Sequence, residues 1–425
     1  MPLELDSRDP GFAAAFDALV FARREVDEDV GATVGEIIAA VRRHGAAAVA
    51  DYTRQFDRID LDAIGWAVPR SERKAALDGL DAALRKALQC AADRIASFHA
   101  AQRPTGYEDA ADGVRRGYRW TPVAAAGLYV PGGRASYPSS VLMNAIPAKV
   151  AGVERLAMVT PAPDGRLNPL VLAAAEIAGV DEVFRVGGAQ AIAALAYGAG
   201  PIAPVDVIVG PGNAWVAEAK RQLYGVVGID MVAGPSEIVV VADGDNDPAW
   251  IAADLMSQAE HDPTSQAILI TDDRALASAV AEAVETLLAE LGGAAVESWA
   301  RHGAIITLAG LGEAAALIDR LAPEHLEIAT AAPQALFDQV RHAGSVFLGR
   351  HTPEAVGDYV GGPNHVLPTG RRARFASGLS VADFMKRTTW LACDPAGLAA
   401  IGPAAVTLAE AEGLPAHARS VSVRL

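Results

Sequence analysis

The chain of 425 residues is 51% hydrophobic and 21% charged, which allows two large domains and excludes an intrinsically disordered protein. Its 36 basic and 52 acidic residues give a formal net charge of -16, which disfavours nucleic acid and anionic membranes as partners and favours a small-molecule ligand. The two cysteines, Cys90 and Cys393, are far apart in the sequence and support neither a disulfide framework nor a thiolate zinc site.

The first residues, MPLELDSRDPGF, contain no basic region followed by an apolar core, and the sequence has no run of about eighteen apolar residues. We therefore expect a cytoplasmic protein that does not span a membrane. Residues 10–99 show helical periodicity in alanine-rich segments such as VGEIIAAVRRHG, which ends at Gly45. These helices contain no paired titratable groups with an evident task, so we interpret them as scaffold.

From Val123, short apolar strands alternate with helical segments. The strands are predicted in AAAGLYVPGG, VERLAMVTPA, EVFRVGGAQ and VDVIVGPGN. This alternation predicts a parallel sheet with helices on its faces. Glycine-rich turns at 132–133, 187–188 and 210–213 follow three of the strands, at the edge where open α/β sheets bind ligands and phosphates. None of the turns matches GxGxxG or a phosphate-binding loop, so a bound dinucleotide is a hypothesis, and the alternative is that these glycines only turn the chain.

A second alternating run follows, with strands predicted in SEIVVVAD, SQAILITDD, AIITLAG, LEIAT and SVFLG. It predicts a second α/β domain. From Gly378 the chain contains helix-compatible segments, and we expect its last residues, EGLPAHARSVSVRL, to end in a strand. This terminal piece is too small for a core of its own, so it should pack on another domain or subunit.

One helix of the second run, which Asp247 should cap and Pro263 should stop, carries Gln258 and His261 on one stripe. This spacing suits a metal-ligand pair, but taken alone it is more often found at a solvated helix end. Gln258 and His261 could combine with two more distant side chains into a mixed nitrogen and oxygen set suited to zinc, formed with Asp358 and His417.

Adjacent Glu324 and His325 stand at a predicted helix-to-strand junction, where both could face a cleft. A histidine and a glutamate there could perform two proton transfers on neighbouring atoms, and a surface turn is the structural alternative. Residue chemistry alone therefore leaves two enzyme classes open, a metal-dependent α/β enzyme that uses a dinucleotide and a metal-dependent hydrolase that does not.

Eight segments together resemble the signature segments of the histidinol dehydrogenase family, and the similarity extends from about Phe98 to the C-terminus. In chain order they are GLYVPGGRASYPSSVLMNAIPAKVAGV, VGGAQAIAALAYG, VGPGNAWVAEAKRQLYGVVGIDMVAGPSE, DLMSQAEHDP, APEHLEI, AGSVFLG, GDYVGGPNHVLPT and EGLPAHARSV. The resemblance implies an enzyme that oxidises L-histidinol to L-histidine through histidinaldehyde, with one zinc ion per subunit and reduction of two NAD, as the last step of histidine biosynthesis.

The resemblance also implies roles for particular residues. Glu324 and His325 match the acid–base pair, and the zinc ligands are matched by Gln258, His261, Asp358 and His417. Of these six residues, all except Glu324 also match substrate contacts. The other substrate contacts are matched by Ser236, His365 and Glu412. The dinucleotide contacts are matched by Tyr129, Gln190 and Asn213. Trp215 departs from the Tyr expected in many relatives, but it keeps an aromatic ring.

The family is a homodimer whose C-terminal piece crosses to the partner, so His417 and Glu412 should complete the other subunit's site. We expect two Rossmann-like parallel-sheet domains with a helical N-terminal region and a small C-terminal tail. The expected boundaries are a helical arm at 1–24, a larger catalytic domain at 25–124 plus 236–378, an NAD-contacting domain at 125–235 and a dimer-crossing domain at 379–425. Two alternatives remain, a zinc-dependent paralogue acting on another primary alcohol such as a sulfonated diol, and a protein that is not a dehydrogenase.

Overall fold

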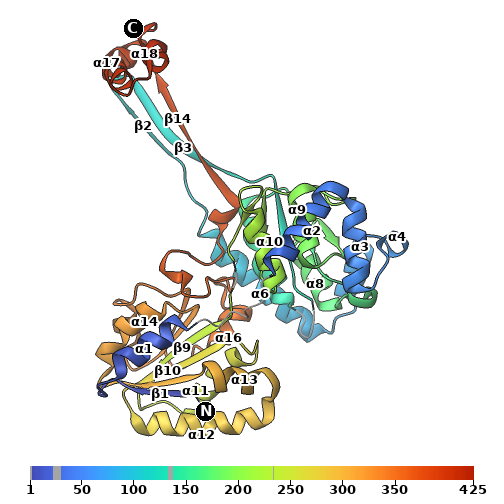
Figure 1. Ribbon diagram of the computed structural model, residues 1–425, viewed down its shortest axis with the longest axis vertical. Helices are drawn as coiled ribbons and strands as arrows, with labels where there is room; N and C mark the ends of the chain where they lie inside the picture. The colour runs from blue at the N-terminus through green and yellow to red at the C-terminus, as the bar shows by residue number, and fades with distance from the viewer. Residues whose placement is uncertain (1, 23–29, 133–136, 233) are drawn as a thin grey trace.

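The computed structural model describes residues 2–22, 30–132, 137–232 and 234–425. Figure 1 shows two α/β bodies side by side and a long arm that projects away from both. Each body contains one parallel sheet, so the prediction of two α/β domains is confirmed. No helix in the described part of the chain is long and apolar enough to cross a membrane.

The first sheet has five parallel strands in the order β6-β5-β4-β7-β8. Strand β4 pairs with β5 on one side and with β7 on the other. In the chain, β5 and β6 come between β4 and β7. The strand order therefore reverses between β4 and β7, which makes this position the topological switch point of the sheet. The strands are β4 (Ala125–Tyr129), β5 (Arg155–Val159), β6 (Glu182–Phe184), β7 (Val207–Val209) and β8 (Gly228–Ile229).

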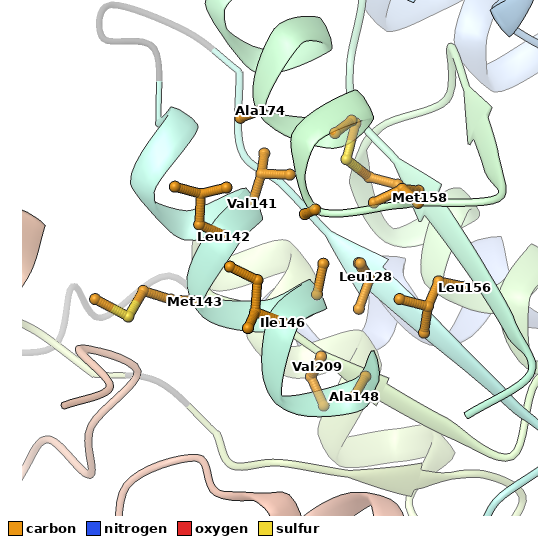
Figure 2. Packing of buried hydrophobic residues seen from close by; sticks show 14 of the residues in the cluster. Leu128, Val141, Leu142, Met143, Ile146, Ala148, Leu156, Met158, Ala174 and Val209 are labelled. Carbon is orange, nitrogen blue, oxygen red and sulfur yellow. The ribbon is translucent and has the colours of Figure 1, made fainter. Parts of the chain in front are cut away.

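Helices cover both faces of this sheet because successive strand residues point to opposite sides. Figure 2 shows Leu128, Leu156 and Met158 packed beside Val141 and Ile146, which lie on α7. The connecting helices are α7 (Pro138–Ala151), α8 (Pro169–Ile177), α9 (Gly188–Tyr197) and α10 (Ala214–Leu223).

The N-terminal helices also pack on this first sheet. Helix α6 (Ala82–Ala100) shares a core with Leu128 and Leu156, whereas α2 (Gly31–His44) and α3 (Ala46–Asp57) share a core with Tyr129 and Val159. The short helices α4 (Leu61–Ile64) and α5 (Arg70–Asp78) complete this region. The expectation that residues 25–124 belong with 236–378 is therefore wrong for these helices, because their apolar stripes are buried against the five-stranded sheet.

The second sheet has six parallel strands in the order β1-β11-β10-β9-β12-β13. Helices α1 (Phe12–Phe21), α14 (Ala314–Leu321) and α15 (Pro333–Phe337) cover one face, and α11 (Pro248–Ala259), α12 (Arg274–Leu291) and α13 (Gly293–His302) cover the other. The strands are β1 (Leu3–Asp6), β9 (Glu237–Ala242), β10 (Gln266–Thr271), β11 (Ala304–Thr307), β12 (His325–Ala329) and β13 (Ser345–Leu348).

The N-terminal residues belong to this second sheet. Strand β1 pairs in parallel with β11, and Phe16 and Val20 of α1 are buried in the core beneath it. The expected helical arm at 1–24 is therefore wrong for the described residues, because the segment adds an edge strand and a packed helix.

An antiparallel sheet forms the arm in Figure 1, with β3 (Val114–Pro122) between β2 (Tyr107–Ala111) and β14 (Met385–Cys393). The arm's tip carries α17 (Pro395–Ala411) and α18 (Pro415–Ser422). The expectation of a C-terminal strand is wrong, since residues 415–422 form a helix that packs on α17.

Candidate active site

Glu324 and His325 lie at the amino end of β12, where an abrupt turn follows α14. Ala322 adopts a left-handed conformation with φ of 45°, and this stops the helix three residues before the strand begins. Glu324 is 6% exposed and His325 is 4% exposed, so the surface-turn interpretation is wrong. The structure brings both side chains into one buried site.

One residue of β9, Glu237, holds both of these side chains through its backbone. Its N–H donates to Glu324 Oε2 over 3.0 Å, and its carbonyl oxygen lies 3.1 Å from His325 Nδ1. A hydrogen on Nδ1 satisfies that carbonyl, which leaves Nε2 as the nitrogen that can accept a proton. His325 Nε2 makes no hydrogen bond to the residues that the structure describes.

Carboxylates surround the free nitrogen of His325. Nε2 lies 3.7 Å from Glu354 Oε1 and 3.6 Å from Asp358 Oδ1, beyond ordinary hydrogen-bond length. Burial disfavours the charged imidazolium, but Glu324, Asp358 and Glu354 outweigh it and raise the pKa of His325 to about 9. Burial alone would raise the pKa of Asp358. The imidazole rings of His325 and His365 outweigh this effect and hold the pKa of that carboxyl well below its usual range.

A chain of buried acids lies behind His325, and the sequence analysis missed it. Glu354, in α16 (Glu354–Val356), accepts a hydrogen bond from Ser257 Oγ over 3.1 Å, and burial raises its pKa to about 8. Glu327 of β12 and Asp254 of α11 are buried close enough to influence each other, and burial raises the pKa of Glu327 to about 9 and that of Asp254 to about 6. Two positional signals could have revealed them, because Glu327 shares a strand face with His325 and Asp254 lies one helical turn before Gln258.

Gln258 lies in the last turn of α11, as predicted, but the helix ends at Ala259, so His261 lies in the turn that follows it. Gln258 is 1% exposed, its Nε2 lies 3.5 Å from His261 Nδ1, and its Oε1 has no hydrogen-bond partner among the described residues. His261 is near enough to His365 to disfavour a charge there. A buried amide oxygen without a partner is costly unless a ligand satisfies it.

Asp358 lies in a π-helical turn (Gly357–Gly361) beside His365. His365 Nδ1 is 3.0 Å from the backbone oxygen of Asp358, and its Nε2 is 3.5 Å from Ser140 Oγ. Ser140 belongs to α7, so His365 connects this site to the domain of the five-stranded sheet. Ser236, half-buried, directly precedes Glu237, and its carbonyl accepts the N–H of Gln266 over 2.9 Å.

The donor atoms of this site fit a divalent cation. Of the expected zinc ligands, Asp358 offers a carboxylate oxygen within 4.8 Å of ligand atoms of His325 and Glu354, and Gln258 offers a buried amide oxygen that has no hydrogen-bond partner among the described residues. Mixed imidazole and oxygen donors suit zinc and similar ions.

His417 and Glu412 do not join this site within one chain. Glu412 ends α17 and His417 lies in α18, both exposed at the tip of the arm and away from the two α/β bodies in Figure 1. Of the six expected zinc and acid–base side chains, five therefore lie in the two α/β bodies, whereas His417 lies at the tip of the arm together with Glu412, an expected substrate contact.

The expected dinucleotide contacts lie at the carboxyl edge of the first sheet. Tyr129 ends β4 and is buried, its Oη accepts the N–H of Gly188 over 3.2 Å, and burial raises its pKa to about 12. Gln190 lies in the first turn of α9, is 1% exposed and has no partner for Oε1 among the described residues. Asn213 caps α10 by accepting the N–H of Val216 over 3.2 Å. Gly133 of the first predicted turn lies outside the described residues.

Two Rossmann-like parallel sheets, with a buried Glu-His pair beside metal-type ligands, define an α/β enzyme. The family model for histidinol dehydrogenase matches residues 21–425. The histidinol dehydrogenase of Zymomonas mobilis is 65% identical over the full length of both chains, and that of Rhodospirillum rubrum is 60% identical over 100% of this chain and 99% of its own. The solved histidinol dehydrogenase of Elizabethkingia anophelis is 35% identical, covers 100% of this chain and 98% of its own, and has a TM-score of 0.94. The chain belongs to the histidinol dehydrogenase family of oxidoreductases.

Proposed function

We propose that this enzyme oxidises L-histidinol to L-histidine through histidinaldehyde, with NAD as the electron acceptor and zinc as the resident metal. Family membership supports the substrate, since the relatives named above are histidinol dehydrogenases. The observation that carries the chemistry is the buried Glu324-His325 pair. The backbone N–H of Glu237 binds the Glu324 carboxylate, and its carbonyl oxygen binds the His325 ring. Two successive oxidations at one carbon need one base twice and a second group for water between them.

In the first oxidation, His325 Nε2 removes the hydroxyl proton as the carbon hydride leaves for NAD. Hydrogen bonding of Nδ1 to Glu237 fixes the ring orientation, so the accepting nitrogen is held in place before substrate arrives. In the hydration step, Glu324 takes a proton from water as the water oxygen adds to the aldehyde carbon, and the protonated His325 returns its proton to the aldehyde oxygen, which completes the hydrate. The neutral His325 then removes a hydroxyl proton from the hydrate as the second hydride leaves for NAD.

Zinc would be held by Gln258, His261 and Asp358 of one subunit with His417 of a second subunit. Bound there, it would supply a Lewis acid for substrate nitrogens and a positive charge that offsets the carboxylates around His325. Ser236, His365 and Glu412 would contact the substrate, and Glu412 would also come from the second subunit. This assignment would account for the exposure of Glu412 and His417 at the tip of the arm.

Tyr129, Gln190 and Asn213 would contact NAD at the switch point of the first sheet, where α/β sheets receive nucleotides. His365, which contacts Ser140 of that domain, would lie between the substrate and the nucleotide side of the site.

The test is the number of NADH molecules formed per histidinol consumed by zinc-loaded enzyme, followed at the NADH absorbance. We expect about two NADH and histidine as product, because one base and one water-activating group serve both oxidations. Formation of one NADH with accumulating aldehyde would contradict the four-electron reaction. Turnover of another primary alcohol but not of histidinol would favour the paralogue.

A further inference from the structure

Lys220 and Asp230 form an ion pair inside the first domain, beside the turn that follows β7. The Lys220 side chain is 2% exposed and the Asp230 side chain 1% exposed, with Lys220 Nζ in contact with Asp230 Oδ1. Lys220 lies in the last turn of α10, and Asp230 directly follows β8. Removing two charges from water is costly, so the ion pair calls for an explanation in the groups that it binds.

Both charged groups bind the backbone of one residue, Gly210. Lys220 Nζ donates to the Gly210 carbonyl oxygen over 3.0 Å, and the Gly210 N–H donates to Asp230 Oδ2 over 2.8 Å. Hydrogen bonds to charged groups are about twice as strong as those between neutral groups. The ion pair therefore fixes both polar groups of a single peptide position.

Gly210 is held where no other residue fits. Its φ is 112°, and a Cβ atom added there would overlap the carbonyl oxygen of Tyr129. The turn after β7 is thus pressed against the end of β4, at the switch point of the sheet. Tyr129 in turn receives the N–H of Gly188 on its hydroxyl, so the turns after β6 and β7 are both positioned against one residue.

We propose that Lys220 and Asp230 are positioning residues that set the turn 210–213 for the dinucleotide, and this inference rests on the proposed function. Asn213 lies three residues after Gly210 and begins α10, whose last turn carries Lys220. The ion pair therefore ties both ends of α10 to the strand edge. Because the two charges neutralise each other, they supply position rather than attraction for phosphate.

The main test is the double variant Lys220→Met/Asp230→Asn, which removes both charges together with little change in volume and so leaves no unpaired buried charge. We expect it to fold with a modest decrease in Tm, because the Gly210 carbonyl loses its donor. The Kd for NADH, measured by nucleotide fluorescence, and the KM for NAD should rise about tenfold or more, because displaced contacts are costly, with KM for histidinol changed less than about twofold. In the NAD-free protein, amide exchange of residues 208–216 should accelerate.

The matched control is Arg73→Met/Glu176→Gln, a buried pair of the same domain with side chains 4% and 9% exposed. Arg73 binds the carbonyl of Val180, just before β6, and so lies at the opposite edge of the sheet. This control should leave the Kd for NADH unchanged. The variant Lys220→Arg, which keeps a charged donor, should retain most of the wild-type affinity for NADH.

A folded double variant with wild-type Kd for NADH and wild-type exchange at 208–216 would overturn the positioning role and leave the proposed function standing. If the double variant does not fold, Lys220→Gln/Asp230→Asn, which removes both charges but keeps a neutral donor and acceptor for Gly210, is judged by the same criteria. A wild-type enzyme that binds no NADH would overturn the proposed function and this inference with it.

Discussion

His325 Nδ1 lies 3.1 Å from the carbonyl oxygen of Glu237, the residue that begins the neighbouring strand. The Glu324-His325 pair therefore lies at the amino ends of β9 and β12. Open α/β sheets usually bind ligands at the carboxyl ends of their strands, as the first sheet is expected to do. The two bodies therefore offer opposite strand edges to the proposed site, and the acid–base edge depends on backbone groups of β9 rather than on a glycine-rich turn.

Separate variants of the pair should affect different half-reactions. His325→Asn should slow oxidation of histidinol by about 100-fold or more, because the general base is lost. Glu324→Gln should mainly slow oxidation of supplied histidinaldehyde, since it removes the group that activates water. Rates with each substrate measure this directly. His44→Asn, an exposed residue of α2, is the control, and equal losses in both half-reactions would contradict the division of labour.

Mixing two inactive variants tests whether subunits share sites. His325→Ala and His417→Ala, unfolded and refolded together, should recover about a quarter of wild-type activity, because half of randomly formed dimers are mixed and each has one intact site. His325→Ala mixed with Glu324→Gln is the control. Each site takes both Glu324 and His325 from one chain, so every site of that mixed dimer lacks one of them, and no activity should return. Mixed dimers without recovery in the first experiment would rule out the shared site.

Metal content should separate ligands from substrate contacts. His261→Asn should lose zinc, measured by elemental analysis of dialysed protein, because a three-ligand remnant holds the ion weakly. His365→Asn should retain about one zinc per subunit and raise the KM for histidinol, since His365 is assigned to the substrate. Chelator treatment of the wild type should abolish turnover, and added zinc should restore it. Loss of zinc from both variants alike would show that His365 is itself a ligand.

The buried pair Glu327 and Asp254 should make stability fall as pH rises. Burial raises the pKa of Glu327 to about 9, far above the value near 4.3 of an exposed glutamate. Between these values the native state keeps a proton that the unfolded chain releases, so the free energy of unfolding decreases with pH, by at most about 1.4 kcal/mol per unit. Glu327→Gln should flatten this decline between pH 5 and 9 in urea denaturation. The control Glu285→Gln, at an exposed position of α12, should leave the decline unchanged. If stability falls with pH equally in both variants, Glu327 is not protonated in the native state.

The sequence predicted both parallel sheets because strand and helix periods alternate clearly in residues 123–348. It could not place the N-terminal helices, since an apolar stripe shows that a helix is buried but not against which sheet. The arm was not predicted, although the sequence contains a local signal for its hairpin. This signal is Asp112-Gly113, which forms a tight turn with φ of 49° and 76° between β2 and β3. Pairing of β3 with β14, more than 260 residues later, has no local signature.

For the site, Gln258 and His261 could be recognised because they are three residues apart at the end of one helical pattern, and Glu324 and His325 because they are adjacent. Glu354 was missed because its role depends on tertiary packing. It approaches His325 only through the turn after β13, which no periodicity fixes.

Alanine substitutions at two glycines should distinguish backbone strain from the close approach at the switch point. Gly210 and Gly225 have φ of 112° and 99°, so a side chain is strained at both positions. Gly225 has no atom within 4 Å of an added Cβ, whereas at Gly210 that atom would overlap the backbone of Tyr129. We expect Gly225→Ala to cost about 1–2 kcal/mol of stability, the usual penalty for a left-handed side chain. Gly210→Ala should cost several kcal/mol, or prevent folding, because the ends of β4 and β7 must separate. If Gly210→Ala costs no more than Gly225→Ala, the backbone contact between Gly210 and Tyr129 does not fix the edge of the sheet. Urea denaturation of the two variants side by side decides between these outcomes.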